Sequence, residues 1–311
     1  MAATTQSPAA SSTPEPNGSA VSPATGGADY YFGAMTEQQR VGQLLMNGGP
    51  ATGVSSTTLD QIDSYHVGSV FLSGRSSAGV TATASISRGI QDRATSHATL
   101  QVPEFVATDQ EGGYVQVLSG SGFSTIPTGL TQGTYSTATL QADARTWGGQ
   151  LRSAGVTLNL APVMGTVPSA AFAPHNPPIG YYDREYGYDP AQVAAHGQAF
   201  VRGMAASHVD TAVKHFPGLG RVTANTDTAS TVVDSQTTRH DSYVGAFDSG
   251  LRSPAQVVMV SSATYSKIDA SQAAVFSPTV ITGMLRGDAH FGGVVMTDDI
   301  NGKAISSIPA A

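Results

Sequence analysis

The sequence has 311 residues, enough for one barrel-sized domain with a tail. Lys and Arg number 15 against 22 Asp and Glu, a net charge of −7, so the basic surface needed to bind nucleic acid is not expected. The sequence contains no cysteine, which excludes disulfides and thiolate metal sites, and it has no apolar run of about 18 residues that would cross a membrane.

The first 29 residues differ in composition from the rest. Ser, Thr, Pro, Ala and Gly dominate them, and the basic start and apolar core of a signal peptide are missing. Because such a composition does not bury a core, we expect a disordered tail over residues 1–29 and one domain over 30–311. Tails of this kind often tether exported domains, which favours an exported or surface location. A remnant at the start of a gene has the same composition, so a cytoplasmic location stays open.

From about residue 30 onward, short β-rich runs alternate with longer helical stretches. A helix is expected over 191–207, where small and apolar residues recur at three- and four-residue steps on one face. Several β-rich runs are continuously apolar, as in parallel strands covered on both faces. The repeated strand–helix order predicts either an open sheet or a closed barrel. The seven predicted strands are Val41–Met46, Val67–Leu72, Glu104–Thr108, Thr157–Val163, Thr211–His215, Gln256–Ser261 and Gly293–Thr297.

Polar residues follow almost every predicted strand, and this favours the barrel. Asp109 follows the third strand, Ser261 ends the sixth, and Asp298 follows the seventh. The carboxyl ends of all barrel strands meet at one mouth, whereas an open sheet concentrates its chemistry at one switch point. No glycine-rich nucleotide motif follows a strand. We therefore predict a (β/α)₈-type barrel without a cofactor or bound metal.

Four polar clusters are candidates for chemistry. Asp298 is the first acid of M-T-D-D after an apolar strand, and it fits either a group facing the mouth or a helix N-cap. Lys214 and His215 close another strand, where they fit either sugar-hydroxyl contacts or a salt bridge with a structural histidine. In T-D-Q-E-G-G-Y-V-Q-V, two acids precede a glycine pair that permits close ligand approach, and the pattern of a calcium loop is absent. The segment 176–190 combines tyrosines with Arg184, as carbohydrate sites and ordinary surface loops both do.

Together these clusters resemble the bacterial β-N-acetylglucosaminidases of glycoside hydrolase family 3. The resemblance runs in order from about Thr36 to Ile300, through the blocks D-Q-E-G-G-x-V-Q, N-L-A-P-V, K-H-F-P-G-x-G and T-D-D-I. It implies a retaining glycosidase with Asp298 as the nucleophile. It also implies four residues that bind the sugar: Asp109, Arg184, Lys214 and His215.

The acid/base residue departs from the family pattern. Members of this branch usually carry D-S-H shortly after the K-H-F-P-G-x-G block, and its histidine protonates the leaving group. Asn225-Thr226-Asp227 occupies those positions here. A carboxylic acid with a raised pKa can transfer the same proton, so Asp227 is our candidate acid/base.

Three further departures concern the sugar contacts. Gly165 stands where an aspartate commonly follows the A-P-V block, and Tyr114 stands where an arginine is usual. Two extra residues separate Arg184 from Ile179–Gly180, compared with the family's I-G-x-R segment.

Only N-G-K-A-I-S-S-I-P-A-A follows Ile300, where the family continues through a last strand and helices. We therefore expect a barrel that lacks its last βα unit and has two exposed edges. Truncation of the gene is the favoured explanation, with a seam filled by another chain or an unstable fragment as the alternatives.

The resemblance predicts release of terminal β-linked N-acetylglucosamine from cell-wall or chitin-derived fragments, with carbohydrate as the partner. A β-glucosidase on the same fold is one alternative. A catalytically inactive barrel that only binds sugar is the other. The sequence does not indicate an oligomeric state.

Overall fold

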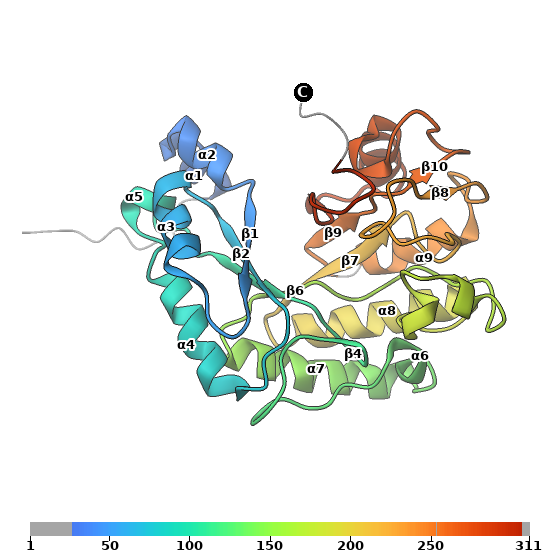
Figure 1. The fold of residues 1–311 in the computed structure, drawn as a ribbon, viewed down its shortest axis with the longest axis horizontal. Coiled ribbons are helices and arrows are strands. Elements are labelled where there is room, and N and C mark those ends of the chain that lie inside the picture. The colour runs from blue at the N-terminus through green and yellow to red at the C-terminus, as the bar shows by residue number, and fades with distance from the viewer. Residues whose placement is uncertain (1–26, 253, 307–311) are drawn as a thin grey trace, which may run out of the picture.

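The computed structural model describes residues 27–252 and 254–306. Seven parallel strands form one curled sheet in the order β1-β2-β3-β6-β7-β9-β11, which confirms a TIM-type barrel architecture (Figure 1). Among the described residues β1 pairs only with β2 and β11 only with β9, so these two strands are the edges of the sheet. The strands are β1 (Met46–Pro50), β2 (Ser69–Ser73), β3 (Phe105–Thr108), β6 (Leu158–Asn159), β7 (Asp210–Phe216), β9 (Val257–Val260) and β11 (Val294–Thr297).

Helices cover the outer face of this sheet. Figure 1 shows α7 and α8 side by side below it, with α4 beside one arm and α9 beside the other. Each of the longer helices turns an apolar stripe toward the strands. The α-helices are α1 (Ala28–Ala34), α2 (Glu37–Gly42), α3 (Ser56–Tyr65), α4 (Gly79–Gln91), α5 (Ser96–Thr99), α6 (Gly129–Gln132), α7 (Thr137–Ser153), α8 (Pro190–Ala205) and α9 (Ser242–Leu251). Shorter or wider helical turns are η1 (Ala173–His175), η2 (Gly180–Tyr182), η3 (Ala274–Phe276) and the π-helix η4 (Thr279–Asp288).

Successive strand residues divide between two hydrophobic clusters because side chains alternate across a sheet. The outer cluster joins Val106 and Val213 to the helices. The inner cluster fills the curl of the sheet and takes residues from all seven strands: Met46, Phe71, Phe105, Ala107, Leu158, Leu160, Ala212, Val257, Met259 and Met296. The interior is therefore a packed core, as in a TIM-type barrel.

Six of the seven predicted strands are confirmed, within a few residues at each end. The first is wrong over most of its length, because the capping box of Thr36 and Gln39 starts α2 instead. The strand in this place is M-N-G-G-P, whose polar and glycine residues carry no apolar strand signal. Pro50 is tolerated because β1 lies at the edge of the sheet. The predicted helix over 191–207 is confirmed as α8.

Two small strand pairs lie outside the main sheet. β4 (Gln110–Gly112) and β5 (Val115–Gln116) form a hairpin directly after β3. β8 (Val233–Asp234) pairs in parallel with β10 (Thr264–Tyr265), which follows β9. The hairpin and β10 therefore belong to the loops at the carboxyl ends of the barrel strands.

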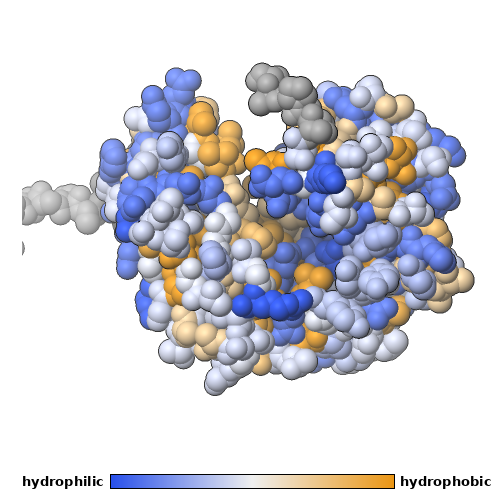
Figure 2. All heavy atoms as spheres, viewed as in Figure 1, coloured by the Kyte–Doolittle hydropathy of each residue, from blue (hydrophilic) through white to orange (hydrophobic). Residues whose placement is uncertain are grey.

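Figure 2 shows a hollow between the two arms of the molecule, with hydrophobic residues on its walls. Residues 1–26 of the predicted tail lie outside the described residues, and α1 begins at Ala28. No helix within 27–252 or 254–306 is long and apolar enough to span a membrane.

Candidate active site

Three charged residues extend the inner face of the sheet beyond its apolar core. Asp109, Lys214 and Asp298 each lie two positions after an inner-cluster residue: Ala107, Ala212 and Met296 respectively. Because side chains alternate along a strand, all three are directed to the same side, at the carboxyl ends of β3, β7 and β11. This is the position of the active site in TIM-type barrels.

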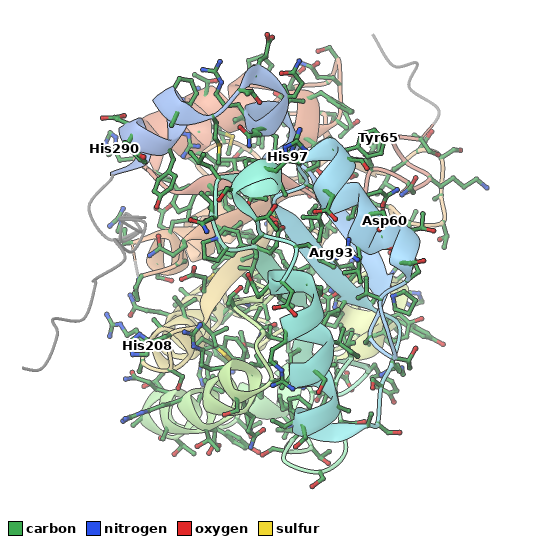
Figure 3. The ribbon with its side chains drawn as sticks, turned by 90° about the vertical axis from the view of Figure 1, so that its left-hand side faces the viewer. Asp60, Tyr65, Arg93, His97, His208 and His290 are labelled. Atoms are coloured by element: carbon green, nitrogen blue, oxygen red, sulfur yellow. The ribbon has the colours of Figure 1, made fainter. Side chains whose placement is uncertain are left out.

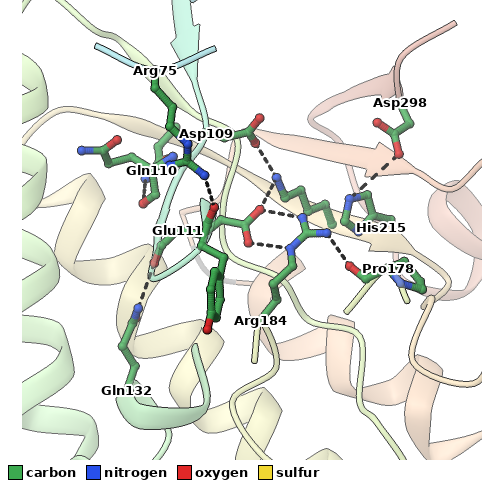
Figure 4. Close-up of polar contacts among 12 residues, drawn as sticks. Arg75, Asp109, Gln110, Glu111, Gln132, Pro178, Arg184, His215 and Asp298 are labelled. Carbon is green, nitrogen blue, oxygen red and sulfur yellow. Dashed lines mark hydrogen bonds and ion pairs between the residues drawn. The ribbon is translucent and has the colours of Figure 1, made fainter. Parts of the chain in front are cut away.

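A network of four charges forms the floor of the site, with Lys214 and Glu111 buried and Asp109 and Arg184 partly buried (Figure 4). The Lys214 Nζ atom lies 2.6 Å from Asp109 Oδ1 and 2.6 Å from Glu111 Oε1. Arg184 donates to both oxygens of Glu111, at 2.9 Å from Nε and 2.7 Å from Nη2. The two positive and two negative charges balance. The network joins β3, β4, β7 and the loop before α8 into one unit.

Pairing within the network sets the charge states of its members. Burial alone would raise the pKa of Glu111, but the charges of Arg184 and Lys214 outweigh it and hold the pKa at about 2. Burial would lower the pKa of Lys214, and the charges of Asp109 and Glu111 raise it instead. Lys214 is only 2% exposed, so its ammonium group remains charged inside the protein because of these two carboxylates.

The sequence around Glu111 explains how the hairpin holds its position. The Gln110 side chain accepts from the Leu118 N–H at 3.0 Å and donates to the Leu118 carbonyl at 2.8 Å. The Gln110 N–H in turn donates to the Asn159 side chain at 3.0 Å, which ties the hairpin to β6. Gly112 has a φ of 110°, and a Cβ atom there would lie 2.2 Å from the Pro127 carbonyl oxygen, so only glycine fits.

The two acids of M-T-D-D have different roles. The Asp299 side chain accepts from the Asn301 N–H at 2.8 Å and so caps the turn after β11. Among the residues that the structure describes, the Asp298 carboxylate accepts a hydrogen bond only from the neighbouring Asp299 N–H, at 2.9 Å, and its side chain keeps 20% exposure at the mouth. Burial raises the pKa of Asp298 to about 6, against the lowering effect of the Asp299 N–H and Lys214. The geometry therefore favours a reactive carboxylate over a helix cap at Asp298.

His215 lies beside Asp298. The register between β7 and β9 shifts between Val213 and Phe216, and both Lys214 and His215 reach the site from this irregular end of the strand. The His215 Nε2 atom is 3.9 Å from Asp298 Oδ2, too far for a hydrogen bond. Burial, and then the charges of Arg184 and Lys214, hold the pKa of His215 well below its usual value, so the imidazole is neutral. Its buried Nδ1 atom has no hydrogen-bond partner within the described protein.

Asp227 lies on the loop after β7. Its N–H donates to the Asn225 side chain at 2.9 Å, so Asn225 shapes the turn that presents it. The Ala304 N–H donates to the Thr226 carbonyl at 2.9 Å, which ties this turn to the segment after β11. The Asp227 side chain is exposed, and partial desolvation together with Asp299 raises its pKa, against the lowering effect of Arg184. Its charge in turn raises the pKa of Asp298, so the two carboxyls interact.

The structure thus brings the predicted site residues into one region. Asp109, Lys214 and Arg184 share the charged network, His215 lies next to Asp298, and Asp227 lies on the loop above them. The central member that sequence reasoning left without a role is Glu111, the second acid of D-Q-E-G-G. The sequence pattern that could have identified Glu111 is a second carboxylate beside a glycine pair. The predicted site also held two basic residues, Arg184 and Lys214, that needed counter-charges.

Within the described ranges, no group of three or more His, Cys, Asp or Glu is placed to hold a metal ion. The groups that the site offers for chemistry are the carboxylates of Asp298 and Asp227, close to the positive charges of Lys214 and Arg184.

Comparisons with known proteins agree with this geometry. Residues 36–310 match the pattern described as the glycosyl hydrolase family 3 N terminal domain. A β-hexosaminidase of Xylella fastidiosa strain M12 is 32% identical over 274 residues, covering 85% of this chain and 77% of the relative.

Two solved structures are also similar. The crystal structure of a β-N-acetylhexosaminidase from Beutenbergia cavernae is 52% identical with a TM-score of 0.87, covering 89% of this chain and 82% of that one. A family 3 β-N-acetylglucosaminidase from Paenibacillus sp. is 30% identical with a TM-score of 0.80, covering 88% of this chain and 51% of that one.

Proposed function

This chain belongs to glycoside hydrolase family 3, and on that basis we propose that it hydrolyses terminal β-linked N-acetylglucosamine by a retaining mechanism. The substrate class we propose is an oligosaccharide fragment of peptidoglycan or chitin. The names of its relatives support the N-acetylhexosamine, and the charged floor of the site supports a ligand rich in hydroxyl groups.

The position of Asp298 is the observation that carries the proposal. Its partly exposed carboxylate follows β11 directly and is directed to the inner side of the sheet. It lies beside the neutral His215 and near the positive charges of Lys214 and Arg184. With Asp298 ionised, this carboxylate and the network of four together carry a charge of −1, because the network itself is neutral. A net negative site favours the positive charge that develops on the sugar ring as the glycosidic bond breaks.

The proposed reaction has two steps. An oxygen of Asp298 forms a bond to the anomeric carbon while the bond from that carbon to the leaving oxygen breaks, and Asp227 donates its proton to that oxygen. Water then attacks the same carbon and gives a proton to the Asp227 carboxylate, and the bond to Asp298 breaks. Two inversions leave the configuration unchanged. Asp109, Lys214 and Arg184 hold the sugar hydroxyls during both steps.

Rates on p-nitrophenyl N-acetyl-β-glucosaminide and on p-nitrophenyl β-glucoside test the proposal. We expect kcat/KM to be at least tenfold higher for the acetamido sugar, and Asp298→Asn to abolish both activities. A preference for the glucoside would move the chain to the β-glucosidase alternative. Specific binding of N-acetylglucosamine by a folded protein without turnover would support a sugar-binding barrel instead.

A further inference from the structure

We propose that Tyr114, Tyr181 and Tyr182 form an aromatic platform at the rim of the site, which binds the sugar on the leaving-group side of a β-linked N-acetylglucosamine oligosaccharide. This inference rests on the proposed function and adds to it a preference for oligosaccharides over simple glycosides.

The three tyrosines form a contiguous and exposed cluster. The rings of Tyr114 and Tyr182 lie 5.9 Å apart between centroids, and those of Tyr181 and Tyr182 lie 4.9 Å apart at an interplanar angle of 82°. The residues are 60%, 62% and 41% exposed for Tyr114, Tyr181 and Tyr182. Large aromatic side chains gathered at the surface in this way mark binding sites more often than they serve the fold.

The platform lies beside the charged floor of the site because the same two segments form both. Glu111 and Tyr114 belong to the β4–β5 hairpin, whereas Tyr182 and Arg184 belong to the loop around η2. The ion pair between Glu111 and Arg184 joins these segments at the floor, and the ring contact between Tyr114 and Tyr182 joins them again at the surface. Three residues of chain reach at most about 10 Å, so the Cα atom of each tyrosine lies within about that distance of the Cα atom of Glu111 or Arg184.

The hairpin holds its aromatic residue in place before any ligand arrives. Arg75 donates to the backbone carbonyls of Tyr114 at 2.6 Å and Gln116 at 2.9 Å (Figure 4). Gly113 at the turn has a φ of 55°, and a Cβ atom there would lie 2.5 Å from the Thr128 side chain. A backbone that is already ordered at Tyr114 loses little conformational freedom on binding, which favours affinity.

The positions of the tyrosines connect them to substrate choice. The family resemblance places Tyr114 at a position where an arginine is usual, and it places Tyr181 and Tyr182 in a segment two residues longer than the I-G-x-R pattern. Two separate departures from the family pattern therefore meet in one surface cluster. Their side chains form an uncharged aromatic cluster at this rim, in which the rings are inclined to one another by 60° and 82°, so that each ring presents its own face.

The direction in which the oligosaccharide leaves the site indicates which sugar contacts the tyrosines. The terminal N-acetylglucosamine occupies the pocket floor at Asp298 and Lys214, so the rest of the oligosaccharide leaves through the mouth and passes the rim. The flat C–H face of a pyranose ring packs on a tyrosine ring, while its hydroxyls remain in water. A neutral leaving-group sugar fits this surface better than a charged one.

The test compares methyl N-acetyl-β-glucosaminide with tri-N-acetylchitotriose. The quantity compared is kcat/KM for the trisaccharide divided by kcat/KM for the methyl glycoside. Both substrates have alkoxide leaving groups, so a change of this ratio in a variant reports contacts to the leaving-group sugars and not leaving-group ability. We expect Tyr114→Ala and Tyr182→Ala each to lower this ratio by about tenfold, the effect of losing one well-packed aromatic contact. Tyr182→Phe retains the ring and should keep the ratio within about twofold.

Tyr65 provides a matched control. It is 64% exposed at the end of α3, on the outer side of the molecule (Figure 3), and Tyr65→Ala should leave the ratio unchanged. Unchanged ratios in both alanine variants of the platform, with an active wild-type enzyme, would overturn the inference and leave the proposed function standing. A wild-type protein that hydrolyses neither substrate would instead overturn the proposed function.

Discussion

The Nε2 atom of His215 lies 3.9 Å from Oδ2 of Asp298, close enough to share one ligand and too far for a hydrogen bond. The imidazole is neutral because burial and two neighbouring positive charges lower its pKa. Within the described part of the chain Asp298 therefore has no cationic partner in direct contact, and burial raises its own pKa to about 6. A weakly partnered carboxylate of this kind is free to attack a substrate.

The pH dependence of kcat/KM should report this carboxylate. Asp298 attacks only when ionised, so protonation below a pKa of about 6 removes activity. On the p-nitrophenyl substrate, whose leaving group needs little help from the Asp227 proton, we expect kcat/KM to level off above about pH 7 and to fall about tenfold for each unit of pH below roughly 5. A pH–rate profile on the p-nitrophenyl substrate, with protein stability checked at each pH, measures the limb. An acid limb near pH 4 would contradict the assignment of this pKa to Asp298.

The charged floor should be sensitive to loss of Glu111. Glu111→Gln leaves Arg184 and Lys214 without the carboxylate that they share, so the free energy of unfolding should fall by about 3 kcal/mol. The exposed pair Arg239–Asp288 provides the control, since solvent screens this pair and Asp288→Asn should lower the free energy of unfolding far less than Glu111→Gln does. Urea denaturation at pH 7 measures both. Similar small losses in the two variants would show that the floor does not depend on Glu111.

Asp227 should show its role through the leaving group. If it donates the proton, Asp227→Asn should reduce hydrolysis of an oligosaccharide by at least about 100-fold and affect an aryl glycoside with a good leaving group far less. Rates on a series of phenyl glycosides with rising leaving-group pKa give a steeper dependence in the variant than in the wild type. Equal losses across the series would remove Asp227 from this role.

Buried Glu104, before β3, should make stability depend on pH. Neither of its carboxylate oxygens has a hydrogen-bond partner among residues 27–252 and 254–306, and burial raises its pKa from 4.5 to about 8. The folded state therefore binds a proton that the unfolded state has released, and stability is full below pH 4.5 and is lost as pH rises toward 8.

Urea denaturation at pH 5 and at pH 8 measures this effect. Glu104→Gln does not ionise, so its free energy of unfolding should fall less than that of the wild type over this range, by about 2–4 kcal/mol. The same pH dependence in the variant and the wild type would exclude Glu104 as the source.

Much of the fold and the site was predictable from local patterns. Continuous apolar runs such as V-V-M-V identify inner strands, and the polar residue after each run, such as Asp298, marks the mouth of the barrel. The first strand was missed because M-N-G-G-P takes its strand conformation from pairing with β2 and not from its own side chains. Non-local pairing of this kind leaves no periodic signal.

The partners of the charged residues were less predictable. The contact between Glu111 and Arg184 joins positions 73 residues apart, and the contact between Lys214 and Asp109 joins positions 105 apart. Such pairs depend on how the loops close over the mouth, and no local spacing encodes them. The tyrosine platform was hidden for the same reason, since Tyr114 and Tyr182 become neighbours only when the two loops meet.

Mass spectrometry of the intact protein, after incubation with 5-fluoro-N-acetyl-β-glucosaminyl fluoride, tests the central claim most directly. The fluorine at C5 slows both steps and the fluoride leaves readily, so a covalent glycosyl-enzyme should accumulate. We predict a mass increase of one fluorinated sugar residue, located on Asp298 by peptide mapping and absent from Asp298→Asn. An adduct on another residue, or turnover of substrate with no adduct, would contradict Asp298 as the nucleophile.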